Sequence, residues 1–211
     1  MPARLRPTAP IAADAILVGD PGRALMLAQV LLEQPKMSNH ARGLWGYSGR
    51  TQAGAELTIQ ATGMGGPSAR VVLADLAELG VRRAIRIGTC ASLGELDLGR
   101  LLIVSEARAL SAGTASPDGE LTEGLRRALP DAHLGVVVSL DSLHDPERER
   151  PSVLAEAADM QTAALLTSAT ELEVAVAAIL IVSERSDSGQ LQDEELEKAA
   201  KRAGAAAATL L

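Results

Sequence analysis

The segment of residues 61–94 constrains the fold of this chain more than any other stretch. It joins a glycine-rich turn at 63–68, an amphipathic helical pattern at 67–79 and a short apolar strand at 84–87 that ends in a polar loop. In α/β proteins, ligand sites form where strands end and helices begin. Because two such junctions lie in this one segment, the sequence predicts an α/β fold with a binding site built around it.

Short strands and helices alternate on both sides of this segment. The other expected elements are strands at 15–18, 44–47, 56–61, 101–105, 134–139 and 174–182, and helices at 24–32, 121–129, 160–170 and 193–211. The strands at 44–47 and 56–61 flank a turn at 52–54, which predicts a hairpin and therefore a mixed sheet. Since no repeat or linker divides the chain, we expect one domain over residues 1–211.

The composition describes an ordinary globular protein that is poor in aromatic side chains. Of 211 residues, 47% are hydrophobic and 22% charged, enough for a well-formed core. The formal net charge of −7 argues against a general nucleic-acid binder, which presents a basic face to phosphates. A bound anion would therefore need a local cationic pocket. With no Phe, one Trp and one Tyr, few side chains can stack on a base.

Several classes of site and location are disfavoured. The single cysteine, Cys90, excludes an internal disulfide and a cysteine metal cluster, and the histidines His40, His133 and His144 lack ligand-like spacing, so we expect no metal site. The first ten residues have no apolar signal core, and the longest apolar run, 174–182, is far below the roughly 20 residues of a membrane span. We expect a cytoplasmic protein with no membrane or nucleic-acid partner.

The glycine-rich turn matches neither common nucleotide-binding motif. Its sequence, GMGGPS at residues 63–68, lacks the third glycine of the dinucleotide fingerprint. No Gly-Lys-Ser or Gly-Lys-Thr occurs anywhere in the chain, so a P-loop is also excluded.

Two predicted strand ends carry an arginine near a glycine: Gly19 precedes Arg23, and Arg86 precedes Gly88 and Thr89. Arg86 lies within an apolar strand, where a charge is costly unless it meets an anion or a carboxylate. A structural salt bridge and an anion site both explain it. Two guanidinium groups with backbone N–H groups and a hydroxyl would form a pocket for a tetrahedral oxyanion.

These residues occur in an order and spacing that resembles the purine nucleoside and uridine phosphorylases. The matching stretches are Gly19-Asp20-Pro21-x-Arg23, Arg42-Gly43, Gly46-Tyr47-Ser48-Gly49, TGMGGPS at 62–68 and Arg86-Ile87-Gly88-Thr89. The resemblance covers nearly the whole chain and weakens after residue 94. It implies a three-layer α/β/α sandwich with a mixed central sheet. It also implies cleavage of a nucleoside to a free base and pentose 1-phosphate, with inorganic phosphate as co-substrate and no cofactor.

The resemblance assigns a phosphate half-site to five residues. Gly19, Arg23, Arg86 and Thr89 match phosphate-binding positions. Arg42 matches an arginine that reaches the neighbouring subunit's pocket, which implies a homo-oligomer built from dimers, commonly a hexamer. In such a site the arginines do not react. They orient the phosphate beside the sugar, where its charge stabilises an oxocarbenium-like transition state.

The sugar half-site departs from the family. Asp159-Met160-Gln161 aligns with a Glu-Met-Glu segment whose second glutamate holds the ribose hydroxyls. We expect Met160 and Gln161 to contact the sugar. Gln161 can accept one hydroxyl and donate to another, but it lacks the negative charge that favours a cationic sugar, so reduced or altered activity is expected. A polar residue on a structural helix is the alternative. The family's N-terminal histidine has no counterpart here.

Glu184 is the candidate general acid. Val182-Ser183-Glu184 aligns with the Val-Ser-Asp of bacterial purine enzymes, whose aspartate protonates the leaving purine. A free glutamate has a pKa of ~4.3, so this role requires burial to raise it. The adjacent Arg185 opposes such a shift, and a surface Glu184–Arg185 ion pair is the alternative.

The remaining base-binding candidates are Cys90, Ala91, His144, Asp159 and Arg185. Ala91 replaces the usual glycine and brings a methyl group to the base pocket. We interpret Cys90 as a small buried side chain there rather than a nucleophile. His144 falls near the position of the family's stacking aromatic.

The base preference is balanced between two branches of the family. The Gln-x-Arg pair that recognises uracil is absent, because the segment around residues 145–158 is shortened, and Glu184 is acidic. Both observations favour a purine slightly. TGMGGPS and RIGT are closer to the uridine branch, so a pyrimidine stays open.

Two other functions remain as alternatives. A nucleosidase would use water in place of phosphate, but water needs no clamp of two guanidinium groups such as Arg23 and Arg86. A non-catalytic member would bind phosphate, a base or a nucleotide, which Gln161 and the missing N-terminal histidine favour.

Overall fold

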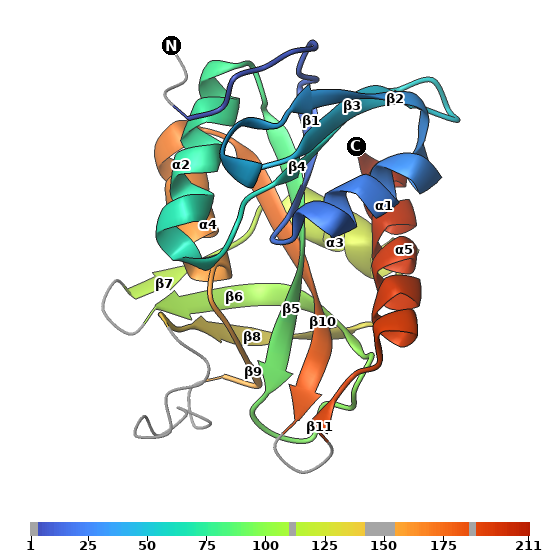
Figure 1. The fold of residues 1–211 in the computed structure, drawn as a ribbon. Helices are drawn as coiled ribbons and strands as arrows, with labels where there is room; N and C mark the ends of the chain where they lie inside the picture. The colour runs from blue at the N-terminus through green and yellow to red at the C-terminus, as the bar shows by residue number, and fades with distance from the viewer. Residues whose placement is uncertain (1–3, 110–112, 142–154, 186–188) are drawn as a thin grey trace.

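The computed structural model describes residues 4–109, 113–141, 155–185 and 189–211 (Figure 1). The strands are β1 (Asp14–Val18), β2 (Leu32–Asn39), β3 (Gly46–Thr51), β4 (Glu56–Ala61), β5 (Arg83–Ser92), β6 (Leu101–Ala109), β7 (Gly113–Ala115), β8 (His133–Ser139), β9 (Ala157–Asp159), β10 (Ala175–Arg185) and β11 (Gly189–Gln190). The α-helices are α1 (Pro21–Leu31), α2 (Gly65–Glu78), α3 (Gly119–Ala128), α4 (Thr162–Leu172) and α5 (Asp193–Leu210).

All described strands belong to one mixed sheet, ordered β11-β10-β6-β8-β9-β5-β1-β4-β3-β2, with β7 beside β6. Strand β1 pairs in parallel with β4 and β5, whereas β2, β3 and β4 form an antiparallel meander. The hairpin predicted from the turn at residues 52–54 is therefore present, and it makes the sheet mixed as expected.

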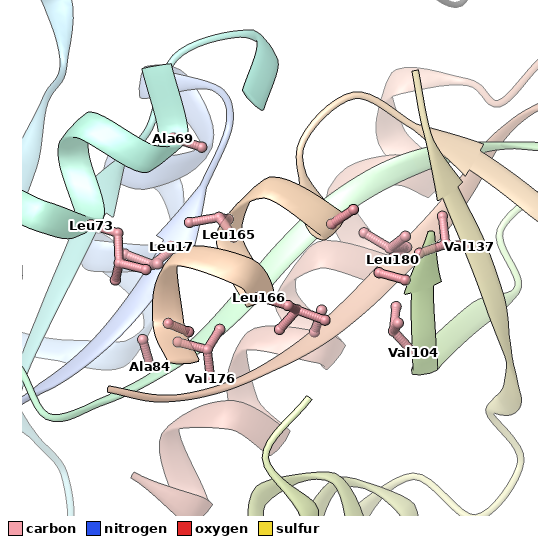
Figure 2. Close-up of a cluster of buried hydrophobic side chains, with 14 of the residues drawn as sticks. Leu17, Ala69, Leu73, Ala84, Val104, Val137, Leu165, Leu166, Val176 and Leu180 are labelled. Carbon is pink, nitrogen blue, oxygen red and sulfur yellow. The ribbon is translucent and has the colours of Figure 1, made fainter. Parts of the chain in front are cut away.

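Helices cover both faces of the sheet, which confirms the three-layer α/β/α sandwich (Figure 1). Helices α2 and α4 pack on one face, and α1, α3 and α5 on the other. One strand can serve two cores because successive side chains point to opposite faces. Thus Leu17 of β1 joins the cluster that contains Leu73 of α2, and Leu165 of α4 belongs to the same cluster (Figure 2). Its neighbour Ile16 joins the second cluster, with Leu27 of α1.

The long strands β5 and β10 create the space for a site. They run side by side in parallel, and further pairings through β6, β8 and β9 close these five strands into a ring among the described residues. Strand β1 ends at Val18, which pairs with Ala61 on one side and Ile87 on the other. Because β5 continues from there to Ser92, it loses β1 as a neighbour and one of its edges becomes available.

Several details differ from the sequence prediction: the short strands β7, β9 and β11 were not predicted, and the strand expected at 44–47 lies at Gly46–Thr51. The strand predicted at 84–87 extends to Ser92, so the expected polar loop at Thr89–Ala91 is strand. The helix predicted from Met160 begins at Thr162, so Met160 and Gln161 lie in the turn before it. Strand β2 was not predicted, because LEQPKMSN contains a proline and five polar or charged residues. It is the last strand of the sheet, where a proline without an N–H is tolerated.

None of the helices in the described ranges is long and apolar enough to cross a membrane.

Candidate functional site

A cavity of about 510 Å³ lies where β1 and β4 end and β5 continues. The loop after β1 contributes Gly19 and Arg23, and β5 contributes Arg86 and Thr89. The remaining wall comes from the glycine-rich turn at 63–65 and from Met160 and Gln161, which precede α4. Most of the residues assigned from sequence to phosphate and sugar therefore face one space.

A larger hollow, of about 610 Å³, lies between residues 9–12 and the β2–β3 hairpin. Its charged side chains are of both signs, and its Arg50 pairs with Glu56 at 3.0 Å. We take the smaller cavity as the candidate site, because two guanidinium groups converge on it.

Arg86 is almost fully buried and held by three side chains. Its Nη2 donates to Asp159 Oδ2 at 3.0 Å, its Nη1 to Gln161 Oε1 at 2.6 Å and its Nε to Thr162 Oγ1 at 3.1 Å. The structural salt bridge considered from the sequence is thus present. A guanidinium group has five N–H bonds, so two remain for an anion in the cavity that Arg86 also lines. The salt bridge is therefore compatible with an anion site, which stays a prediction.

Gly88 provides the room for the Arg86 guanidinium. A Cβ at this position would lie 2.6 Å from Arg86 Nη2 and 2.8 Å from its Cζ, distances that a real side chain does not tolerate. The glycine of the RIGT stretch thus allows the arginine to lie along its own strand.

Asp159 is buried beneath Arg86, and its carboxylate is saturated with donors. Besides Arg86, it accepts from the backbone N and the hydroxyl of Thr162, and its Oδ1 lies 2.5 Å from Ser139 Oγ. These bonds tie the start of α4 to β5 and β8. Thr162 and Ser139 were not singled out from the sequence. The spacing of Asp159 three residues before Thr162, typical of a helix N-terminus, was the available signal.

Arg23 supplies the second positive charge and has no hydrogen-bond or ion-pair partner for its guanidinium within the described part of the chain. Asp20, the N-cap of α1, accepts from the backbone N of Arg23 at 2.7 Å and so fixes the first turn of the helix. Burial lowers the pKa of Arg23 below its ordinary value, Asp20 counteracts this and the charge of Arg86 adds to the lowering. An anion between Arg23 and Arg86, beside the N-terminus of α1, would relieve this repulsion.

Gln161 joins Arg86 to the glycine-rich turn. Its Nε2 donates to Gly63 O at 2.5 Å and lies 3.3 Å from Gly65 O. Both glycines have positive φ angles, 72° and 77°, a conformation that other residues rarely adopt. The turn therefore presents carbonyl oxygens to Gln161. Gln161 lies in the turn before α4 rather than on the helix and lines the cavity, and its hydrogen bonds go to protein atoms, so its role toward a sugar stays a prediction.

Arg42 lies outside the cavity of its own chain. It is exposed, in the short 3-10 helix Ala41–Gly43, with a left-handed φ of 60°. Its role as a contact to another subunit stays a prediction.

Three of the residues predicted to contact a base do not line the cavity. Asp159 points to Arg86, and Cys90 and Ala91 are each only 1% exposed on β5. We predicted that Asp159 contacts a base, but its carboxylate positions Arg86 instead, because protein donors already use the acceptor capacity of both its oxygens. Burial raises the pKa of the Cys90 thiol, as does the charge of Asp159, which keeps it protonated and disfavours a nucleophilic role.

The other candidates for the base half-site lie at the far ends of β5 and β10 or outside the described residues. Glu184 is half-buried near the end of β10, in register with Ala91 of β5, and does not line the cavity. Arg185 pairs with Asp97 at 3.0 Å, so this arginine has a partner other than Glu184. His144 falls outside the described ranges.

Within those ranges, no group of three or more His, Cys, Asp or Glu side chains is arranged to hold a metal ion.

Comparisons with known proteins place the chain in context. The family model described as the phosphorylase superfamily matches residues 14–211. A DeoD-type purine nucleoside phosphorylase from Alkaliphilus metalliredigens is 31% identical over 210 residues, covering 88% of this chain and 88% of the relative. One from Oceanobacillus iheyensis is 42% identical over 84 residues, covering 39% of this chain and 35% of that protein.

Solved structures show the same fold. A uridine phosphorylase from Vibrio fischeri, complexed with 6-hydroxy-1-naphthoic acid, superimposes with a TM-score of 0.85 at 22% identity. The match covers 95% of this chain and 91% of that protein. A purine nucleoside phosphorylase from Toxoplasma gondii, in complex with immucillin-H, has a TM-score of 0.83 at 20% identity. The match covers 95% of this chain and 89% of that protein. At these identities the likeness concerns the fold alone.

The two arginines of the site should differ in their effect on stability. Arg86→Met is expected to lower the free energy of unfolding by about 3–5 kcal/mol, because it leaves Asp159 as a buried unpaired charge. Arg23→Met, which breaks no ion pair, should change it by less than about 1 kcal/mol. Urea unfolding followed by circular dichroism measures both.

The double variant Arg86→Met/Asp159→Asn serves as the control, since it removes the orphaned charge and should recover part of the loss. Equal destabilisation by the two single substitutions would contradict this account of Arg86.

Proposed function

This chain belongs to the phosphorylase superfamily, and from that premise we propose that it is a nucleoside phosphorylase. In the proposed reaction, inorganic phosphate cleaves the N-glycosidic bond of a nucleoside and yields a free base and pentose 1-phosphate. The observation that carries the proposal is the guanidinium of Arg23, which has no ion-pair partner among the described residues and lines the same cavity as Arg86. Two cations in a partly buried space favour a multiply charged oxyanion.

The phosphate would bind between Arg23 and Arg86, with the Thr89 hydroxyl and the loop at Gly19 completing the pocket. One phosphate oxygen then forms a bond to the anomeric carbon as the carbon–nitrogen bond breaks, and the electron pair of that bond leaves with the base. Holding the phosphate beside the sugar lowers the barrier in two ways. It fixes the geometry of attack, and its charge stabilises the cationic sugar.

The nucleoside would lie with its sugar against Met160 and Gln161 and its base toward the ends of β5 and β10. Glu184, near the end of β10, is the proposed acid that protonates a leaving purine. The DeoD-type relatives, which match most of the chain, support a purine over a pyrimidine. Phosphate is a co-substrate in this proposal, and no metal or organic cofactor takes part.

A non-catalytic binding protein is the second candidate. The observation that favours it is the amide of Gln161, which is engaged with protein atoms where the resemblance implies a glutamate that binds ribose. Hydrolysis by water is disfavoured, because the charge of Arg23 would have no substrate to meet.

Phosphate dependence tests the proposed reaction. Purified protein should release base from inosine or adenosine, or from uridine, only when inorganic phosphate is present. Arg23→Met should lower kcat/KM by roughly 10- to 100-fold, the effect of one or two lost charge-assisted hydrogen bonds. Chromatographic detection of base and pentose 1-phosphate measures the outcome.

Arg50→Met is the matched control, since Arg50 pairs with Glu56 on the surface, away from this cavity, and the substitution should leave the rate unchanged. Base release without phosphate would indicate a nucleosidase. Binding without release from any of the three nucleosides would favour the non-catalytic alternative.

The proposed acid can be tested separately. Glu184→Gln should reduce kcat for inosine by about 10²- to 10⁴-fold, the usual contribution of a general acid, because a glutamine cannot deliver a proton to the leaving base. Glu171→Gln, a change on an exposed face of α4, serves as the control. A loss of less than about threefold for Glu184→Gln would remove this residue from the mechanism.

We further propose that the active unit is a homo-oligomer in which Arg42 reaches the neighbouring copy's cavity. Arg42 is exposed and outside its own site, and Met37, Trp45 and Met64 expose 42%, 37% and 86% of their surface. Aromatic, methionine and arginine side chains are enriched in interfaces between proteins.

Mixing two variants tests this arrangement. Arg42→Ala and Arg23→Met should each be impaired alone. In a one-to-one mixture with random dimer exchange, half of the dimers carry both substitutions in different copies and retain one complete site, so about a quarter of the wild-type activity should return. Steady-state assays before and after exchange measure it. A monomer in analytical ultracentrifugation, or no recovery after exchange, would contradict the shared site.

A further inference from the structure

We propose that Asn39 is a positioning residue for Arg42. Its buried amide holds the turn at residues 41–44 in the conformation that presents Arg42 to a second copy of the chain. The inference rests on the proposed role of Arg42 in a homo-oligomer, and it adds how an exposed arginine is fixed for that role.

The backbone at Arg42 is strained. Its φ of 60° and ψ of 20° lie in the left-handed region, and Gly43, with a φ of 71°, follows in the same region. Glycine adopts this conformation freely, whereas a residue with a Cβ does so at an energetic cost. Such strain persists only where surrounding contacts enforce it, and it gathers at functional sites. The contacts that hold this turn therefore bear on the role of Arg42.

The strain does not serve a contact of the Arg42 side chain within its own chain. Among the described residues, its guanidinium takes part in no hydrogen bond or ion pair. The residue is exposed and does not line the cavity that contains Arg23 and Arg86. A fixed backbone beneath such a side chain suits a contact with another molecule, because less conformational freedom is lost on binding.

Asn39 bridges the two sides of the turn. Its Nδ2 donates to Ala41 O at 3.4 Å, before Arg42, and to Leu44 O, after it. One backbone bond, from Leu44 N to Ala41 O at 3.1 Å, closes the same turn. A second buried amide, Gln60, donates to Leu44 O at 2.8 Å. Within the described chain, only the side chain of Asn39 reaches both flanks of the strained residue.

The protein fixes Asn39 in its turn. The residue is 0% exposed, and its Oδ1 accepts from Arg6 N at 2.8 Å, which leaves Nδ2 for the turn. The chain is anchored just before this contact, since Arg4 N and Leu5 N both donate to Asp75 Oδ2 of α2 at 2.7 Å. The exposed turn is thus connected to helix α2 through this amide and residues 4–6.

These partners require an amide. An asparagine accepts at Oδ1 and donates two hydrogens from Nδ2, whereas a carboxylate of the same shape has none to donate. Asn39→Asp keeps the acceptor for Arg6 N but turns a second oxygen toward Ala41 O and Leu44 O. The substitution therefore releases the turn while the size of the side chain and Arg42 itself stay the same.

The affinity for inorganic phosphate, measured by titration calorimetry on the full chain, tests whether Asn39 acts through Arg42. Arg42→Ala should weaken it by roughly tenfold, the loss of one charge-assisted hydrogen bond. Asn39→Asp should weaken it by roughly 3- to 10-fold, because the share of copies with Arg42 in its bound conformation falls. In the Arg42→Ala background, Asn39→Asp should change the affinity by less than about twofold, since the arginine through which it acts is gone.

Thr58→Val is the matched control. Thr58 is also buried, accepts from Ala12 N at 2.9 Å and lies 2.9 Å from Ser48 Oγ, and neither contact involves the turn. Both substitutions should lower thermal stability, but only Asn39→Asp should weaken phosphate binding and speed amide hydrogen exchange at residues 40–45. Asn39→Leu, which removes the hydrogen bonds without adding a charge, replaces the aspartate variant if that protein does not fold.

Two results would overturn the inference and leave phosphorolysis standing. One is unchanged hydrogen exchange at residues 40–45 in a folded Asn39 variant. The other arises where Arg42→Ala weakens phosphate binding, and is an Asn39 variant with wild-type affinity or with an effect that adds fully to that of Arg42→Ala. If Arg42→Ala leaves phosphate binding unchanged while exchange in the Asn39 variant rises, the proposed role of Arg42 between copies fails and the hold on the turn stands.

Discussion

The buried charge of Arg86 is the constraint on which the rest of the site depends. A guanidinium inside an apolar strand must be compensated, and the structure does so with one carboxylate, one amide and one hydroxyl, from Asp159, Gln161 and Thr162. Because these three residues precede or begin α4, the same bonds fix how this helix approaches β5. Arg86, whose charge would attract an anion, thus also connects the sheet to α4 through its hydrogen bonds.

Only part of the positive charge that Arg86 and Arg23 bring to the cavity is neutralised, and this makes the cavity suitable for an anion. Asp159 balances one arginine, but Arg23 enters the same space without a partner in the described chain. The two guanidinium groups repel each other until an anion separates them. In the proposed function, phosphate binds where the fold has left an excess of positive charge, in a protein whose net charge is −7.

Local signals in the sequence predicted most of the fold. Pro21 lies at the start of α1, and Gly80, with a φ of 104°, follows the end of α2, because these residues act through their own backbone geometry. Strand β2 was missed, since its pairing with β3 rather than its composition makes it a strand. The extension of β5 through Thr89 and Cys90 was missed for a related reason. It depends on the parallel partner β10, far away in the sequence.

The sequence by itself determined which residues line the proposed phosphate half-site. Gly19, Arg23, Arg86 and Thr89 follow or occupy strands that end at one edge of a parallel sheet, so their convergence follows from the fold class. Only the tertiary structure decided what Asp159 and Gln161 do. In the sequence, Asp159 and Gln161 lie 73 and 75 positions from Arg86, and Gln161 lies 98 positions from Gly63. No local pattern specifies which of several polar groups a buried side chain will meet. That choice is made by packing, because a buried donor or acceptor must find a partner among the atoms that the fold brings to it.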